Sequence, residues 1–390
     1  MTGNTLGWVI VAFVLYLLMM IAIGAFYAKG NNNSEDYFLG GRKLNGFVAA
    51  LSAQASDMSG WLLMGLPGAI YLTGVGGDGW IAIGLFIGTT LNWLFIATKL
   101  RRYTIRANNS VTLPTYFENR FHDEKKVLMT VSSITIVVFF LVYCASALSA
   151  GGQLFESVFG IDYHVALTIG ALVVLVYTFL GGFTAVCVTD FIQGMLMLVG
   201  ILAVPLFAYH FLTTGGTTLS VGLEASGADS ANFLNLMKNG DGSNNIISVI
   251  SGLGWGLGYF GMPHILVRFM AVRDEKEMTK SKATAISWVA LSLGFAVFIG
   301  ILGRAYLPEL VNGNNEKVFI EMIKKVFTVE MRAPFIAGLF LCGILAAIMS
   351  TADSQLLVSA SSVAEDIFKG LLKKDADDKT VMNCLLYTSD

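Results

Sequence analysis

The chain has 390 residues, of which 55% are hydrophobic and 13% are charged, with a mean hydropathy of +0.68. Soluble domains usually carry about 25% charged residues, so this composition excludes a protein that folds around one water-soluble core. The formal net charge of −2 says little by itself, and we expect no nucleic-acid partner.

Nine apolar runs are long enough to cross a bilayer as helices, which takes about 20 residues each. They lack the period-two alternation of barrel strands, so the sequence predicts an all-α polytopic membrane protein in a lipid bilayer. The runs cover 7–28, 47–73, 79–99, 127–157, 163–182, 188–213, 245–271, 284–306 and 333–364.

The basic residues are distributed unevenly between the predicted loops. An N-terminus placed outside the membrane puts most of the 25 Lys and Arg residues, Arg268 among them, on the inner side. Inner loops of membrane proteins carry such an excess, so we predict that the N-terminus lies outside. The first run has no basic segment before it and is too long for a signal peptide, which indicates an anchored helix.

Two acidic residues, one in each of two predicted runs, are the first candidates for a functional site. Asp57 is near the middle of the 47–73 run, where a carboxylate costs about 2.5–3.5 kcal/mol on insertion scales. Intramembrane acids are usually functional, so we interpret Asp57 as part of a cation site, with a structural hydrogen-bonded network as the alternative. Asp190, at the start of the 188–213 run, is either a second such acid or an acid matched to a helix N-terminus.

The 245–271 run, NIISVISGLGWGLGYFGMPHILVRFMA, carries five glycines and a proline, so an unbroken helix is not expected. The 47–73 run also has a polar, glycine-containing middle. These are the second and seventh runs. Transporters built from two inverted five-helix repeats have broken first helices in both repeats, with the binding site at the breaks. The sequence therefore predicts such a core with two broken helices.

The ninth run carries Ser350, Thr351, Asp353 and Ser354, which a lipid-facing helix would not carry. Small polar residues can simply mediate helix packing. The alternative is a set of oxygen ligands for a hard cation, because an unwound helix offers backbone carbonyls that a hydroxylated helix can complement.

Aromatic residues lie near the same breaks: Trp61 by the first, Trp255 and Tyr259 by the second, and Tyr143 in the 127–157 run. They are packing residues or, beside exposed half-helix ends that can hold a carboxylate, walls of a site for a small amino acid. The sequence has no P-loop, HExxH or GxSxG motif and no Cys/His cluster, so we predict no catalytic residues, no enzymatic activity and no cofactor.

Several longer motifs resemble the solute:sodium symporter family, in particular its bacterial proline carriers. The similarity extends over nearly the whole chain, to about residue 370. The motifs are DYFLGGRKL at 36–44, SDMSGWLLMGLPGA at 56–69, VTLPTYF at 111–117, YTFLGGFTAV at 177–186, GWGLGYFGMPHILVRFMA at 254–271, KVFIE at 317–321 and AAIMST at 346–351.

The resemblance implies one extra helix at 1–30, a first five-helix repeat at 47–213, three of five helices of a second repeat at 245–364, and a cytoplasmic tail at 365–390. Because the family continues beyond these helices, we expect a reading frame truncated in the second repeat. The chain ends ADDKTVMNCLLYTSD, and its last eight residues, NCLLYTSD, do not resemble the expected continuation; this end is expected not to be native, with a natural short variant as the alternative.

The resemblance also implies site residues. Asp57 would be the charge that sodium binding requires, and Arg42 would be an inner-face residue tied to coupling. Asp190 and Ser354 would form a second sodium site, and whether this chain has that site stays an open question. Asp353 and Met262 depart from the serine and glutamine expected there. The implied sodium ligands are the carbonyls of Ala55, Met58 and Ala347 and the hydroxyls of Ser350 and Thr351. The implied proline site consists of Ser59, Gly60, Trp61, Tyr143, Trp255, Tyr259 and Pro263.

The expected function is sodium-coupled uptake of proline by alternating access, in the inner membrane of a bacterium. A symporter for another small solute, such as pantothenate or another amino acid, would share the sodium residues and differ around Tyr143, Trp255 and Met262. A truncated fragment that binds ligand without moving it is the third interpretation.

Overall fold

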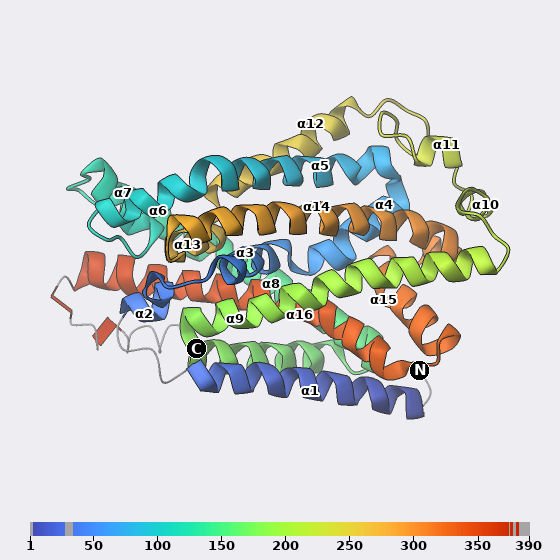
Figure 1. Cartoon of the computed structure of the whole chain (residues 1–390), viewed down its shortest axis with the longest axis horizontal. Coiled ribbons are helices and arrows are strands. Elements are labelled where there is room, and N and C mark those ends of the chain that lie inside the picture. The colour runs from blue at the N-terminus through green and yellow to red at the C-terminus, as the bar shows by residue number, and fades with distance from the viewer. Residues whose placement is uncertain (1–2, 28–33, 374, 377–379, 382–390) are drawn as a thin grey trace.

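The computed structural model describes residues 3–27, 34–373, 375–376 and 380–381, and its regular secondary structure over these ranges is helical. Most long helices run along the longest axis of an elongated bundle (Figure 1). Helices α2, α6 and α7 lie at one end, here named the α7 end, and α10 and α11 lie at the opposite end, the α10 end. The last nine residues of the predicted tail, 382–390, lie outside the described residues.

The first half of the chain forms nine α-helices. Short 3-10 and π-helical segments extend some of them. The α-helices are α1 (Gly3–Tyr27), α2 (Ser34–Leu39), α3 (Gly46–Gly60), α4 (Leu66–Thr73), α5 (Val75–Leu91), α6 (Ala97–Arg106), α7 (Leu113–Phe121), α8 (Val127–Phe159) and α9 (Tyr163–Thr214). The extensions that matter below are η2 (Gly40–Arg42) and η3 (Trp61–Gly65).

The second half is arranged around two long helices and one bent pair. Its α-helices are α10 (Leu219–Ala225), α11 (Ser230–Phe233), α12 (Ile246–Gly254), α13 (Pro263–Ala271), α14 (Glu275–Tyr306), α15 (Val318–Ile323) and α16 (Pro334–Ser361). Its main extensions are η5 (Trp255–Gly261), η8 (Lys324–Glu330) and η9 (Ser362–Leu372).

Six of the described helices are long and apolar enough to cross a membrane, and the bent pair of α12–η5 with α13 makes a seventh candidate span. The chain is therefore a multi-pass membrane protein. The two other predicted runs are also helical but interrupted. The 47–73 run is divided into α3, η3 and α4. The 163–182 run ends at Gly182 (φ 62°, ψ −165°), where the chain leaves helical geometry before the rest of α9.

The first break lies at Ser59, whose backbone is in the left-handed region (φ 51°, ψ −173°). This conformation is costly for a residue other than glycine. The Ser59 hydroxyl compensates in part by accepting a hydrogen bond from the Trp61 N–H at 3.0 Å. Gly60 follows in a tight contact, where a Cβ atom would lie 3.0 Å from Ile348 of α16. The predicted break in this helix is confirmed.

The second break is a bend of 47° between the Ile246–Gly261 segment and α13. Its glycines allow backbones to meet: a Cβ on Gly256 would lie 2.2 Å from the Gly84 carbonyl oxygen of α5. Pro263 begins α13 at a position where its missing N–H costs nothing. This second predicted break is also confirmed.

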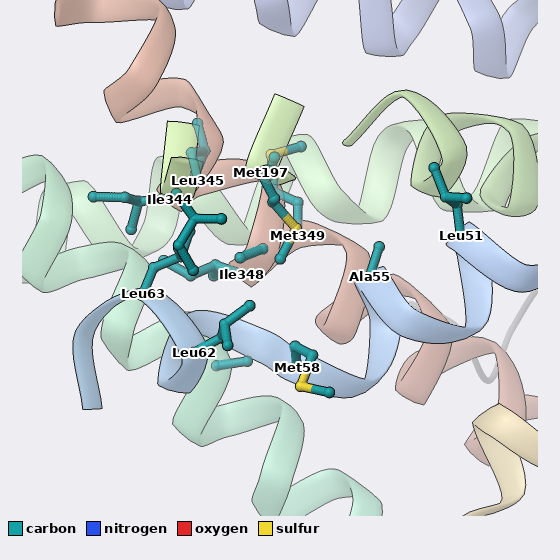
Figure 2. Packing of buried hydrophobic residues seen from close by; sticks show 14 of the residues in the cluster. Leu51, Ala55, Met58, Leu62, Leu63, Met197, Ile344, Leu345, Ile348 and Met349 are labelled. Carbon is teal, nitrogen blue, oxygen red and sulfur yellow. The ribbon is translucent and has the colours of Figure 1, made fainter. Parts of the chain in front are cut away.

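Helix α16 forms the centre of the fold and packs against α1, α3, α8 and α9. Figure 2 shows Ala55 of α3 and Leu63 of η3 on the side that faces Ile348 and Met349 of α16. Burial of apolar surface does not drive helix association in lipid, so close packing and polar contacts must hold α16 in place. Its polar residues are buried, and the Ser350 hydroxyl makes an interhelical contact by donating to the Ala55 carbonyl of α3.

Candidate functional site

A cavity of about 550 Å³ lies between the two broken helices and α8. The Trp61 and Trp255 rings stack across it, with centroids 5.8 Å apart and planes 21° apart. The lining also contains polar groups from Ser146, Ser149 and Gln153 of α8. Aromatic walls with a few polar groups are typical of a small-molecule site.

Six of the seven residues predicted for solute binding line this cavity: Ser59, Gly60, Trp61, Tyr143, Trp255 and Tyr259. Pro263 does not line it. The structure places Pro263 in a separate cavity of about 20 Å³, beside Pro114 of α7 and Val358 of α16. The reason is that the chain bends at Met262, which lines the large cavity and directs the next residue toward the α7 end. Pro263 therefore lies outside the lining of the large cavity.

Asp57 lies at the edge of this cavity and is 8% exposed. Its Oδ2 atom has no hydrogen-bond partner among the described residues. Tyr259, from the second break, faces the carboxylate. A buried carboxylate without a base beside it favours a cation in its neighbourhood, because an isolated buried charge is costly.

The predicted sodium residues of α3 and α16 come together next to Asp57. The Ser350 hydroxyl donates to the carbonyl oxygens of Ala55, at 2.9 Å, and of Ala347, at 3.2 Å. The Thr351 hydroxyl donates to the Ala347 carbonyl at 3.1 Å. The Met58 carbonyl, beside the break, accepts from the Trp61 N–H. The fold thus gathers oxygen atoms from an unwound helix and a hydroxylated helix, which residue types alone could only suggest.

Sequence reasoning assigned Arg268 to an inner loop, and the structure corrects this. Arg268 is fully buried in α13, because the second half of the bent span turns into the bundle. It donates to Asp190 Oδ2 at 3.1 Å and to the Ser354 hydroxyl at 2.5 Å. Its guanidinium therefore lies between the two residues predicted for a second sodium. A basic residue inside PHILVRFMA was the signal that could have revealed it.

Arg42 connects the start of the first broken helix with the end of the second. Its guanidinium donates to the Ser110 carbonyl at 2.8 Å and to the Met270 carbonyl at 2.9 Å. Burial lowers the pKa of Arg42, and the Glu35 carboxylate opposes this shift. The backbones of Leu44 and Val272 pair beside it in an isolated parallel bridge. The α7 ends of the two broken helices are thus held together by polar contacts.

The sequence profile of the Sodium:solute symporter family matches residues 37–388. The chain is 44% identical over 379 residues to the sodium/proline symporter of Salmonella typhimurium, a match that covers 96% of this chain and 73% of that protein. It is 45% identical over 365 residues to the high-affinity proline transporter PutP of Bacillus subtilis, covering 93% and 74%. The chain belongs to the sodium:solute symporter family.

Solved structures agree on the fold. A Na⁺-coupled sialic acid symporter in its substrate-bound outward-open state superposes with a TM-score of 0.82 at 21% identity, covering 98% of this chain and 79% of that one. Mhp1, a nucleobase-cation-symport-1 family transporter, superposes with a TM-score of 0.56 at 13% identity. The inverted-repeat transporter fold with two broken helices is therefore the fold of this chain.

Proposed function

We propose that the chain carries proline into the cell together with sodium, by alternating access. One observation carries the proposal: the two breaks meet at an aromatic cavity directly beside the contact between α3 and α16. Relatives named for proline transport are 44% and 45% identical to this chain and support proline as the solute. The chain would act as a carrier and not as an enzyme.

The proposed sodium ligands are oxygen atoms of α3 and α16. In the structure the Ser350 and Thr351 hydroxyls donate to carbonyls of the same set. Rotation of these hydroxyls would turn their lone pairs toward a bound cation and leave the carbonyls free to coordinate it as well. The ligands are the carbonyls of Ala55, Met58 and Ala347 and the hydroxyls of Ser350 and Thr351.

The proposed solute site uses the six cavity-lining residues named above. The backbone near Gly60, freed by the break at Ser59, would hold the solute carboxylate. The rings of Trp61 and Trp255 would enclose the apolar ring of proline. A small amino acid fits within the cavity of about 550 Å³.

Asp57 would couple the two sites. It lines the solute cavity and follows Ala55 by only two residues, so a sodium ion that neutralises it also joins α3 to α16. Each ligand should then tighten binding of the other by the same factor. One sodium ion moving down 100 mV and a tenfold gradient supplies about 3.7 kcal/mol, enough for roughly 500-fold accumulation of a neutral solute.

We place the α7 end inside the cell and the N-terminus outside. The α7 end carries Arg101, Arg102 and Arg120, as the positive-inside rule requires, and α1 begins at the α10 end (Figure 1). The contacts of Arg42 at this end would have to open when solute is released inward, which gives Arg42 a role in coupling. The bacterial inner membrane is the proposed location.

Met262 favours one alternative. It lines the cavity where the resemblance predicts a glutamine, so the solute could be another small molecule, such as pantothenate or another amino acid. The sodium residues would be unchanged in that case. Competition of pantothenate and of other amino acids against radiolabelled proline would show which of these solutes the cavity binds.

Uptake of radiolabelled proline into proteoliposomes tests the proposal, with and without an inward sodium gradient. The sodium/proline symporter of Escherichia coli serves as the positive control, since it is 44% identical. We expect sodium-driven accumulation that an inward gradient of choline does not support. Protein that is folded and inserted but gives no uptake of proline or of any competitor would contradict the proposal, leaving ligand binding without transport.

A further inference from the structure

Arg268 is a charged side chain buried within the bundle, and oxygen atoms surround its guanidinium. The side chains of Arg268 and Asp190 are both 0% exposed, with Nη2 and Oδ2 3.1 Å apart. Three further oxygens accept from the same guanidinium: Ser52 Oγ at 3.1 Å, Ser354 Oγ at 2.5 Å and the His264 carbonyl at 2.7 Å. The face of the Phe183 ring lies 5.2 Å away.

These four oxygens come from α3, α9, α13 and α16. A carboxylate, two hydroxyls and a backbone carbonyl are the ligand types that small hard cations take in proteins. The guanidinium occupies the space between them. Asp190 Oδ2 also accepts from the Ser52 hydroxyl at 2.7 Å, so this oxygen already has two donors. The arrangement therefore has the composition of a cation site whose cation is covalently attached to the chain.

We propose that Arg268 is a tethered cation that takes the place of a second sodium between Asp190 and Ser354. The inference rests on the proposed sodium coupling. It makes Arg268 a residue that determines how many ions are coupled to the solute: one sodium binds beside Asp57, and the second position is permanently filled.

The location of Arg268 gives it a second consequence. Ser52 precedes Ala55 by three residues, and Ser354 follows Ser350 by four, so the Arg268 cluster lies about one helical turn, roughly 5.4 Å, from the proposed sodium ligands. It lies on the side of the α7 end, where α3 begins. A sodium ion at Ala55 and Ser350 thus faces a fixed positive charge on its release side. That charge opposes inward leakage of sodium until α3 and α16 move relative to α13.

The test compares the wild-type chain with Arg268→Ala and with the double variant Arg268→Ala/Asp190→Asn. Removing the side chain leaves a space lined by the four oxygens, with Asp190 unpaired. We expect sodium activation of uptake to be non-cooperative in the wild type and cooperative in Arg268→Ala. Thermal stability in detergent, measured in sodium chloride against choline chloride, should rise more steeply with sodium concentration in Arg268→Ala. The cooperativity of sodium activation and the steeper rise of thermal stability with sodium should both disappear in the double variant.

Arg268→Lys is the conservative control and should keep the non-cooperative sodium dependence, because the positive charge remains. Folded Arg268→Ala with wild-type sodium dependence in both measurements would overturn the proposal. So would a wild-type ratio of two radiolabelled sodium ions per solute, a measurement that holds even if Arg268→Ala fails to fold. If the wild type gives no sodium-driven uptake, the proposed function fails instead, and the sodium-dependent thermal shift of Arg268→Ala still tests this site.

Discussion

The two broken helices occupy corresponding positions in the fold, yet they break in different ways. The first break is a single buried residue, Ser59, in a left-handed conformation, and Gly60 after it packs closely against Ile348 of α16. The second is a 3-10 segment, Trp255–Gly261, in which Trp255 is 51% exposed and Leu257 is 73% exposed. One break is fixed by dense packing, whereas the other is spread over seven residues.

This difference suggests a division of roles. In the proposed mechanism sodium needs carbonyl oxygens at fixed positions, and the packed first break would supply them beside Ser350. An organic solute needs a wall that can close around it, and the glycine-rich second break provides a more adaptable one. We therefore expect substitutions at the first break to change sodium dependence and substitutions at the second to change solute affinity. The predictions below separate these effects.

The largest expected effect is that of Asp57→Asn. The change keeps the shape of the side chain and removes the charge that the proposed sodium ion would require. We expect sodium stimulation of uptake to fall on the order of 100-fold, about 2.7 kcal/mol, as for loss of a strong charge-assisted contact. Initial uptake rates with and without a sodium gradient measure it. Asp241→Asn, in the exposed loop at the α10 end, is the matched control. Equal sodium stimulation in Asp57→Asn and wild type would remove Asp57 from the ion site.

Gly256→Ala should destabilise the second break itself. The added Cβ would lie 2.2 Å from the Gly84 carbonyl oxygen, so α5 and η5 must move apart. Overpacking of this kind costs about 1–3 kcal/mol. Thermal unfolding in detergent should show a lower midpoint. Gly254→Ala is the control, because nothing lies within 4 Å of a Cβ there. If both variants unfold alike, the backbone contact with α5 is not what holds this break.

Ser350→Ala should weaken sodium binding at the first break. It removes a hydroxyl that contacts the Ala55 carbonyl at 2.9 Å. We expect the half-saturating sodium concentration to rise about 10-fold, or roughly 1.4 kcal/mol, while solute affinity at saturating sodium stays the same. Ser361→Ala is the control on the same helix, since its hydroxyl donates to the Val358 carbonyl one turn earlier. If the half-saturating proline concentration, measured at saturating sodium, also rose in Ser350→Ala, the proposed division of roles between the two breaks would be contradicted.

Trp255→Phe should have the smallest effect and should act on the solute. It shortens one partner of the stack with Trp61, whose centroid is 5.8 Å away. We expect the half-saturating proline concentration to rise about 3-fold, or roughly 0.6 kcal/mol, near the lower end for an aromatic pair. Sodium activation should be unchanged. Trp80→Phe is the control, because Trp80 does not line the cavity and donates to the Leu236 carbonyl. An altered sodium dependence in Trp255→Phe would show that the second break also carries the ion site.

The local features of this protein could be predicted from its sequence. Long apolar runs specify helices in lipid, because a segment there must satisfy its own backbone hydrogen bonds. The glycines around Trp255 and the polar residues around Asp57 marked both breaks, because backbone freedom and uncompensated charge are properties of neighbouring residues. The grouping of Ser350 and Thr351 on one helix likewise indicated a helix that does not face lipid, and both side chains are fully buried. These signals need no knowledge of which helices touch.

Only the tertiary structure decided which partners these residues meet. Arg268 reads as the basic end of a span, but the bend of α13 buries it against residues 216, 86 and 78 positions away in the sequence, in α3, α16 and α9. Pro263 reads as a cavity residue beside the break, yet the same bend directs it into a different cavity. The physical reason is common to both: a bend of 47° rotates every side chain that follows it, and the sequence shows that a bend occurs but not its direction.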